Sequence, residues 1–217
     1  MQKLRFSSVF WDFGGVITSS PFEAFSKFEI DNHLPKDFIR KVNSTNHKAN
    51  AWAKLEQSKI SLDKFDELFR EESKSLGHEV SGSEVLNLLQ GEVRTEMVRA
   101  LQKLKEENFK LACLTNNFNS GDKNQSALDD ANQERLKIMS NFDYIVESKE
   151  LGIRKPDHDF YLKALEITKA KPEETIFLDD LGINLKPAKE LGMTTIKVLD
   201  SNQALKELTD LTGVNFE

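Results

Sequence analysis

Polar side chains that could carry out chemistry stand at the ends of three short apolar runs in this sequence. Asp12 ends the first run, Thr115-Asn116 follows the second, and the adjacent carboxylates Asp179-Asp180 follow the third. Lys155 lies between the second and third groups along the chain. A carboxylate can act as a nucleophile, hydroxyl and amide groups can hold phosphate oxygens, a lysine can neutralise charge, and paired carboxylates can bind Mg²⁺. Together these groups would form an apparatus for phosphoryl transfer.

Each group, taken alone, also has a purely structural interpretation. A strand-ending Asp12 could merely shape a turn, and Thr115-Asn116 could cap a helix or form an Asx turn. Lys155 alone is typical of a solvated surface residue, although Pro156 fixes the chain directly after it. For Asp179-Asp180 the functional interpretation rivals the structural one, because adjacent carboxylates repel and a shared cation relieves the repulsion. The joint pattern therefore argues more strongly than its parts.

The elements that must position these groups alternate along most of the chain. Short apolar runs predict β-strands at residues 6–12, 110–114, 144–146, 175–178 and 194–198. Helical periodicity precedes three of them, at residues 93–104, 161–167 and 185–191. This alternation predicts an α/β fold with a Rossmann-like parallel sheet and helices on both faces. The carboxyl ends of the strands would then share the edge where such folds bind ligands.

The segment between the first two strands does not alternate and reads as helices alone. Helical spacing of apolar residues appears at 22–28, 38–42, 62–76 and 85–89. We therefore predict an α/β core domain made of residues 1–17 and 91–217, with a helical cap domain, residues 18–90, inserted after the first strand. An insertion at this point is placed to cover a site at the strand ends. The polar stretch 116–132 predicts a loop and the start of a helix.

Aromatic side chains are frequent in the predicted cap, and two interpretations are open. They could line an apolar channel, which would suit a lipid phosphate, or they could form the core that a small helical domain needs. The residues concerned are Phe22, Phe25, Phe28, Trp52, Phe65 and Phe69.

Composition excludes several classes of protein. The 217 residues are 38% hydrophobic and 30% charged, as expected of a soluble globular chain. With 30 Lys and Arg against 36 Asp and Glu, the formal net charge is −6, so we expect neither a nucleic-acid partner nor an anionic membrane surface. No apolar stretch predicts a signal peptide or membrane insertion. The single cysteine, Cys113, excludes an internal disulfide and predicts a reducing, cytoplasmic location; the oligomeric state stays open.

The four polar groups, in this order, resemble the four motifs of the haloacid dehalogenase-like hydrolase superfamily. The motifs here are Asp12-Phe13-Gly14-Gly15-Val16, Leu114-Thr115-Asn116, Lys155-Pro156 and Phe177-Leu178-Asp179-Asp180. More narrowly, the chain is similar to the N-terminal phosphatase domain of soluble epoxide hydrolase and to the N-terminal hydrolase-like domain of acyl-CoA dehydrogenase family member ten. Residues 177–193 and 204–208 carry much of this closeness, and the resemblance spans nearly the whole chain.

The resemblance implies a phosphatase that acts on a small phosphorylated molecule. Asp12 would be the nucleophile that forms an aspartyl-phosphate, and Lys155 would orient it and offset charge. Thr115 and Asn116 would bind the transferred phosphoryl group.

The resemblance also implies Mg²⁺ as the cofactor. Its ligands would be Asp12, the backbone carbonyl of Gly14, and Asp180, with Asp179 and Asn184 in support. Mg²⁺ prefers few protein ligands and several waters, which suits this short set.

One departure from the family pattern bears on activity. Most phosphatases of the family carry a second Asp two residues after the nucleophile, as general acid and then base, but here that residue is Gly14. A positioned general acid contributes roughly 10²–10⁴-fold to a rate. The chain would then be a slow phosphatase selective for good leaving groups such as acyl phosphates, or one whose acid comes from the cap. His33, His47 and Glu56 are the cap residues that could donate a proton.

Two other functions stay open. Loss of the acid would also suit a catalytically weak pseudo-hydrolase that binds a phosphate ligand or a partner. Family dehalogenases attack carbon and also lack the second Asp, but they need no metal and would leave Asp179-Asp180 unexplained.

Overall fold

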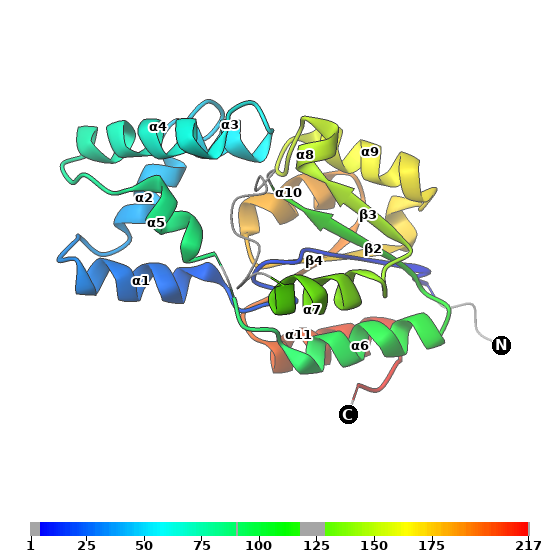
Figure 1. Ribbon diagram of the computed structural model, residues 1–217. Coiled ribbons are helices and arrows are strands. Elements are labelled where there is room, and N and C mark those ends of the chain that lie inside the picture. Colours follow the sequence, from blue (N-terminus) through cyan, green and yellow to red (C-terminus); the bar gives the residue numbers. More distant parts are fainter. Residues whose placement is uncertain (1–4, 90, 118–128, 217) are drawn as a thin grey trace.

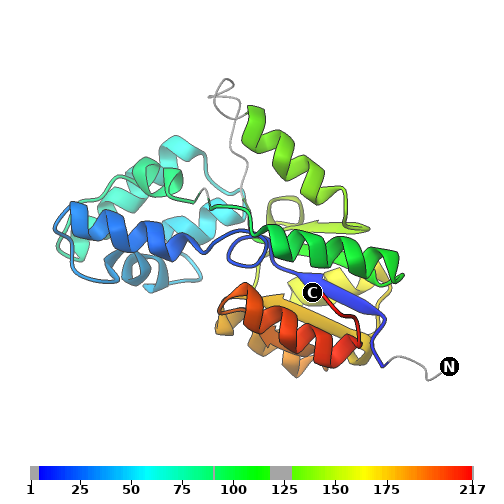
Figure 2. The same cartoon turned by 90° about the horizontal axis from the view of Figure 1, so that it is seen from below.

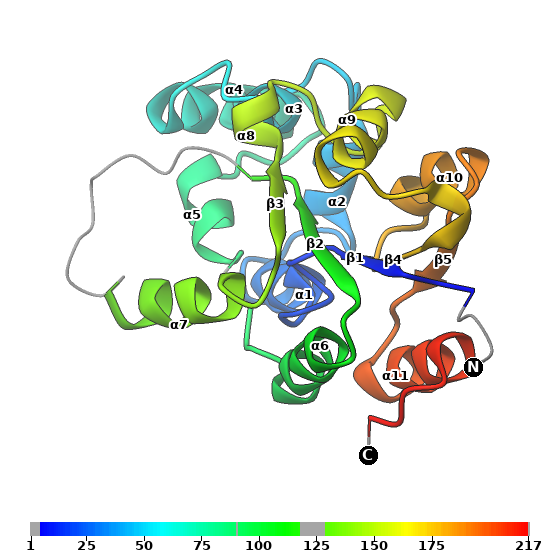
Figure 3. The same cartoon turned by 90° about the vertical axis from the view of Figure 1, so that its right-hand side faces the viewer.

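A five-stranded parallel sheet forms the centre of the molecule. The computed structural model describes residues 5–89, 91–117 and 129–216. The strand order is β3-β2-β1-β4-β5, with every neighbouring pair parallel (Figure 3). The strands are β1 (Ser8–Trp11), β2 (Lys110–Thr115), β3 (Tyr144–Glu147), β4 (Thr175–Asp179) and β5 (Thr194–Lys197). All five predicted strands are present, and the predicted α/β class is confirmed.

Helices cover both faces of the sheet because successive strand residues point to opposite sides. On one face, Val9 and Trp11 of β1 belong to a hydrophobic cluster with α6 (Thr95–Glu106), α7 (Asp129–Met139) and α11 (Ser201–Thr212). Figure 2 shows α6 and α11 side by side on this face.

On the other face, Phe10 packs in a second cluster with α9 (His158–Thr168) and α10 (Gly182–Glu190). Short elements α8 (Ser148–Leu151) and η1 (Pro172–Glu174) complete the core. Residues 118–128 of the predicted loop lie outside the described residues, and α7 follows them.

Of the helices between β1 and β2, the first five form what we call the helical insert, and α6 follows them in the core. They are α1 (Pro21–Asp31), α2 (Phe38–Ser44), α3 (Ala51–Glu56), α4 (Leu62–Ser75) and α5 (Gly82–Asn87). The insert lies beside the end of the sheet toward which the strands run (Figure 1). It has a hydrophobic cluster of its own, to which all six aromatic residues weighed above contribute. The aromatic side chains thus build the core of the insert, as the second interpretation predicts.

Four of the five insert helices were expected from periodicity, but α3 was missed. Six residues are too few for a clear helical period. The residue in the sequence that could have indicated α3 is Asn50. Its side chain accepts a hydrogen bond of 2.8 Å from the Ala53 N–H and so caps the helix. The same side chain donates to the carbonyls of Asn43 and Thr45, each at 2.9 Å. Asn50 therefore holds the α2–α3 turn as well as the helix start.

The two chain passages between core and insert are paired with each other. Thr18 and Val93 form an antiparallel bridge, and the Ser19 N–H donates to the Glu92 carbonyl at 2.7 Å. Gly91 is required here because a Cβ at this position would lie 2.5 Å from the Ser19 carbonyl oxygen. The insert therefore joins the core through one paired crossing. Within the described ranges, no helix is long and apolar enough to cross a membrane.

We predict that Asn50→Ala lowers the free energy of unfolding by about 2 kcal/mol, because a buried cap and two carbonyl partners are lost together. Ser61→Ala is the matched control: Ser61 caps α4 from an exposed position, and its loss should cost only about 1 kcal/mol or less. Urea denaturation of both variants measures the difference. Equal losses would contradict the role given to Asn50.

Candidate active site

The predicted site residues meet at the carboxyl ends of three neighbouring strands. Asp12 directly follows β1, Thr115 is the last residue of β2, and Asp179 is the last residue of β4. In the sheet, Trp11 pairs with both Cys113 and Leu178, so the residues beyond these positions emerge at one edge. Asp12, Thr115 and Asp179 are all buried.

Lys155 is the centre of this group. Its ammonium nitrogen Nζ lies 3.0 Å from Asp12 Oδ1 and 2.7 Å from Asp179 Oδ2, and the residue is only 1% exposed. Burial alone would lower the pKa of Lys155, but the carboxylates of Asp12 and Asp179 outweigh it and raise that pKa. The two carboxylates therefore favour the charged form of Lys155 beside the predicted nucleophile.

Asp179 serves mainly to hold Lys155. Besides the ammonium group, its carboxylate accepts from the Leu181 N–H at 2.8 Å and from Asn184 Nδ2 at 3.0 and 3.1 Å. The Tyr161 hydroxyl in turn donates to the Asn184 carbonyl at 2.6 Å. A fully buried carboxylate needs such partners. Asn184 thus holds Asp179 beside Lys155, and the supporting role of both residues at a cation site stays a prediction.

Asn116 has a role that its position in the sequence did not reveal. Its amide Nδ2 donates to the Lys155 carbonyl at 3.0 Å, and its Oδ1 accepts from the Lys155 N–H at 2.9 Å. Both ends of the side chain are therefore engaged by the backbone of the lysine. Contact between Asn116 and a phosphoryl group stays a prediction, and in this arrangement it would fall to the Asn116 backbone N–H.

Three carboxylates gather where a cation could be held. Oxygens of Asp12, Asp179 and Asp180 lie within 4.8 Å of one another. Burial raises the pKa of Asp12, with Asp179 and Asp180 adding to the effect and Lys155 opposing it. Burial, followed by the charge of Asp179, likewise raises the pKa of Asp180 to about 6.

This donor set fits Mg²⁺. Carboxylate oxygens are its preferred protein ligands, and a divalent cation would favour the ionised form of carboxyls that burial and mutual repulsion now disfavour. Two contacts of the Asp12 carboxylate, from Lys155 and from the Phe13 N–H at 2.7 Å, go to Oδ1. Its Oδ2 lies outside these two contacts.

Gly14 borders open space. A Cβ built at this position would have no atom within 4 Å, and Gly14 is not among the residues with positive φ. Gly15 differs, because it has φ +78° and a Cβ there would lie 2.3 Å from Asp180 Oδ2. The absence of a side chain at Gly15 therefore allows the Asp180 carboxylate to approach the backbone closely. At position 14, by contrast, no steric contact requires a glycine.

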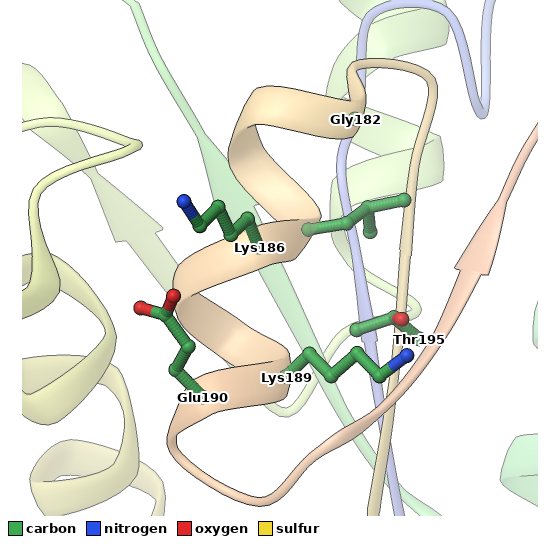
Figure 4. A pocket seen from close by; sticks show the side chains of 6 residues that line it. Gly182, Lys186, Lys189, Glu190 and Thr195 are labelled. Atoms are coloured by element: carbon green, nitrogen blue, oxygen red, sulfur yellow. The ribbon is translucent and has the colours of Figure 1, made fainter.

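A hollow elsewhere in the core lies against α10. Figure 4 shows Lys186 and Glu190 on one side of this helix, and Lys189 reaching toward Thr195 on the other. Gly182 and Leu185 complete its lining. The lining includes neither Lys155 nor any of the three clustered carboxylates, so we place the chemistry at the strand ends.

Comparison with known proteins agrees with this geometry. Residues 6–192, most of the chain, match the family model described as haloacid dehalogenase-like hydrolase. The chain belongs to this family. The four motifs and the Asp cluster all lie within the matched residues.

Relatives of this haloacid dehalogenase-like hydrolase include much longer proteins. The chain is 33% identical over 204 residues to bifunctional epoxide hydrolase 2 of Mus musculus, and the match covers 89% of this chain and 36% of the relative. It is 34% identical over 214 residues to acyl-CoA dehydrogenase family member 10 of the same organism, covering 96% and 19%. The chain thus spans about a third or less of the length of these relatives. The narrower resemblance predicted from the motifs is confirmed.

A phosphatase and a solved structure match over nearly their full lengths. Sesquiterpene phosphatase astK of Aspergillus oryzae is 28% identical over 215 residues, covering 96% of this chain and 97% of the relative. A HAD family enzyme from Bacteroides thetaiotaomicron, solved in complex with magnesium and inorganic phosphate, has 22% identity and a TM-score of 0.59, covering 88% and 93%. The second likeness shows the fold alone.

The insert contacts the core of the hydrolase next to Lys155. Arg154 forms an ion pair with Glu56 at the end of α3 and also donates to the His47 carbonyl. Ser148 Oγ donates to the Glu56 carbonyl at 2.7 Å and accepts from the Asn117 N–H at 2.9 Å. Arg154 and Ser148 were missed from the sequence, because only the fold brings them to residues about a hundred positions away.

The three predicted proton donors of the insert have different surroundings. Glu56 is buried, and its carboxylate accepts from Trp52 Nε1 at 3.0 Å and from Arg154. These contacts make it an acceptor that anchors the insert. His33 and His47 have exposed side chains. The structure therefore gives none of the three a donor contact toward Asp12.

We predict a pH signature for Glu56. Burial raises its pKa above the ordinary value of 4.5, against the opposing charge of Arg154. A folded-state pKa that is raised means that the folded protein binds the proton more tightly, so stability falls as pH rises from about 4.5 toward that pKa. The native protein should therefore lose stability relative to Glu56→Gln over this window.

Glu79→Gln is the matched control of opposite sign. Its hydrogen bond and ion pair with Lys74 lower the Glu79 pKa, so the native advantage over this variant should persist or grow as pH rises. Urea denaturation with a chelator, between about pH 4.5 and neutrality, measures both differences. A pH-independent difference for Glu56→Gln would show that its carboxyl is not perturbed.

Proposed function

We propose that the protein is a Mg²⁺-dependent phosphatase that hydrolyses a phosphate monoester through an aspartyl-phosphate on Asp12. One observation carries the proposal: the Asp12 carboxylate is held through Oδ1 by the buried ammonium group of Lys155, 3.0 Å away. A carboxylate oriented by one oxygen can use the other as a nucleophile. The family and the phosphatase among its relatives support the same reaction.

In the first step, Asp12 Oδ2 attacks phosphorus and forms an acyl phosphate. The bond between phosphorus and the ester oxygen breaks, and that oxygen leaves with the bonding electron pair. Lys155 offsets the negative charge that gathers on Asp12 and the phosphoryl group. Thr115, which is buried at the end of β2, would bind the phosphoryl oxygens together with the backbone N–H of Asn116.

In the second step, water attacks the phosphorus of the acyl phosphate. The bond between phosphorus and the Asp12 oxygen breaks, inorganic phosphate forms, and the Asp12 carboxylate is regenerated. Gly14 offers no side chain to protonate the leaving group or to deprotonate the water. Substrates with good leaving groups, such as acyl phosphates, should therefore react best, and the second step should be slow.

Asp12, Asp180 and the Gly14 carbonyl would hold the cation, with Asp179 supporting from the Lys155 side. Bound there, Mg²⁺ would supply positive charge to offset that of the phosphate oxygens. The enzyme of related fold from Bacteroides thetaiotaomicron was solved in complex with magnesium and inorganic phosphate, which supports this choice of ion.

The helical insert would act as a cap domain over the site, with residues 18–90 as the cap and residues 1–17 and 91–217 as the core. Contacts from Arg154 and Ser148 to the insert beside Lys155 support this division. The substrate would be a small phosphorylated molecule. A lipid phosphate, a cytoplasmic location and the absence of a nucleic-acid partner stay predictions.

The lack of an acidic side chain at Gly14 favours a second candidate function. The protein would then be a catalytically weak pseudo-hydrolase that binds a phosphate ligand or a partner. Position 14 borders open space, and the family resemblance puts the general acid of most phosphatases at this position. A 2-haloacid dehalogenase would leave the cluster of Asp12, Asp179 and Asp180 without a purpose. Release of halide from a 2-haloacid would reveal that activity.

Asp12→Asn should abolish phosphate release in the presence of Mg²⁺, by at least about 10³-fold, because the amide is not a nucleophile. The assay measures phosphate released from a panel of monoesters and acyl phosphates. Asp210→Asn, the same change at an exposed position on α11, should leave the rate unchanged. Turnover by Asp12→Asn at the native rate would refute the nucleophile, and no turnover by the native protein would favour the pseudo-hydrolase.

Gly14→Asp should create the missing acid. Position 14 has room for a side chain and no positive φ, so the variant should fold normally. We expect kcat/KM for alkyl phosphates to rise by about 10²-fold, and that for acyl phosphates to change little. Gly14→Asn controls for shape without acidity. Equal rates for the Asp and Asn variants would show that a missing acid does not limit the reaction.

A further inference from the structure

Ser20 stands at the start of α1, where a serine normally caps the helix, yet it does not cap it. No side-chain capping bond is made, and Pro21 occupies the first helical position. The Ser20 hydroxyl instead donates to Asp180 Oδ2 at 3.1 Å, across 160 positions of sequence. A residue at the edge of the insert thus contacts a carboxylate of the core.

Asp180 differs from the other two carboxylates of the cluster. Lys155 holds Asp12 and Asp179 by ion pairs at 3.0 and 2.7 Å. The Asp180 carboxylate instead rests on the backbone of Gly15, where no Cβ would fit, and receives the Ser20 hydroxyl. Its direction is therefore set by the loop that leads from β1 into the insert.

The position of Ser20 is itself well determined. The preceding residue, Ser19, donates through its N–H to the Glu92 carbonyl at 2.7 Å, and its Oγ accepts from the Glu92 N–H at 3.0 Å. This pairing is the crossing through which the insert joins the core. Ser20 is the next residue, so any change in the crossing would move its hydroxyl relative to Asp180.

We propose that Ser20 is a positioning residue that holds Asp180 in the direction needed to bind the divalent cation, and so links cation binding to the insert. The inference rests on the proposed function, in which Asp180 is a cation ligand. Hydrogen bonds to metal-binding carboxylates orient them, and loss of such a bond typically weakens metal affinity by about 10–100-fold. By reciprocity, bound cation would stabilise the contact between Ser20 and Asp180.

The test measures Mg²⁺ affinity by calorimetry and Mn²⁺ affinity by electron paramagnetic resonance, both without substrate. Ser20→Ala should weaken both affinities by about tenfold, whereas Ser20→Thr, which keeps the hydroxyl, should stay within about twofold of the native protein. Ser26→Ala, an exposed serine on the same helix, is the matched control and should change nothing. Unchanged thermal unfolding of the cation-free variants separates positioning from stability.

The outcomes distinguish this inference from the proposed function. Native affinity in Ser20→Ala, or equal losses in Ser20→Ala and Ser20→Thr, would overturn the role of Ser20 while leaving the phosphatase in place. Asp180→Asn tests the ligand itself and should lose the cation. If the native protein binds neither Mg²⁺ nor Mn²⁺, both the cation site and the role of Ser20 are overturned.

Discussion

The buried ammonium group of Lys155 is the interaction on which the rest of the site depends. It lies between the carboxylates of Asp12 and Asp179, and it offsets the charge of both, whereas the two carboxylates repel each other. The surrounding polar groups hold Lys155 and these two carboxylates in place. Asn116 holds the lysine backbone from β2, and Asn184 holds Asp179 from α10. Three strand ends and one loop are therefore joined by a single cluster of one ammonium group, two carboxylates and the amides that hold them.

Sequence patterns were sufficient for the parts that depend on local chemistry. Buried parallel strands are short apolar runs, so all five could be found, and a polar residue after such a run must lie at the ligand edge of the sheet. Contacts made by loops were beyond reach. The Asn116 side chain hydrogen-bonds to the Lys155 backbone, and Arg154 pairs with Glu56. Both contacts depend on the path of loop backbone, which hydrophobic periodicity does not predict. The short helix α3 escaped for the related reason that six residues show no period.

Gly14 and the insert together define the chemical character of the protein. The site has an Asp12 carboxylate held by Lys155 and a cluster of three carboxylates, but Gly14, where the proposed reaction would need an acid, carries no side chain. Glu56, a buried acid of the insert, is committed to Arg154 and Trp52. An enzyme built this way would form the acyl phosphate from an activated donor more readily than it would hydrolyse it. The covalent intermediate should therefore accumulate.

Because the aspartyl-phosphate should accumulate, its detection on Asp12 is the most direct test of the mechanism. The protein, with Mg²⁺, would be mixed with radiolabelled acetyl phosphate, quenched in acid, and digested to locate the label. We predict a label on Asp12 that hydroxylamine removes, as expected of an acyl phosphate. Turnover without any covalent label, or a label on another residue, would contradict the assignment of Asp12 as the nucleophile.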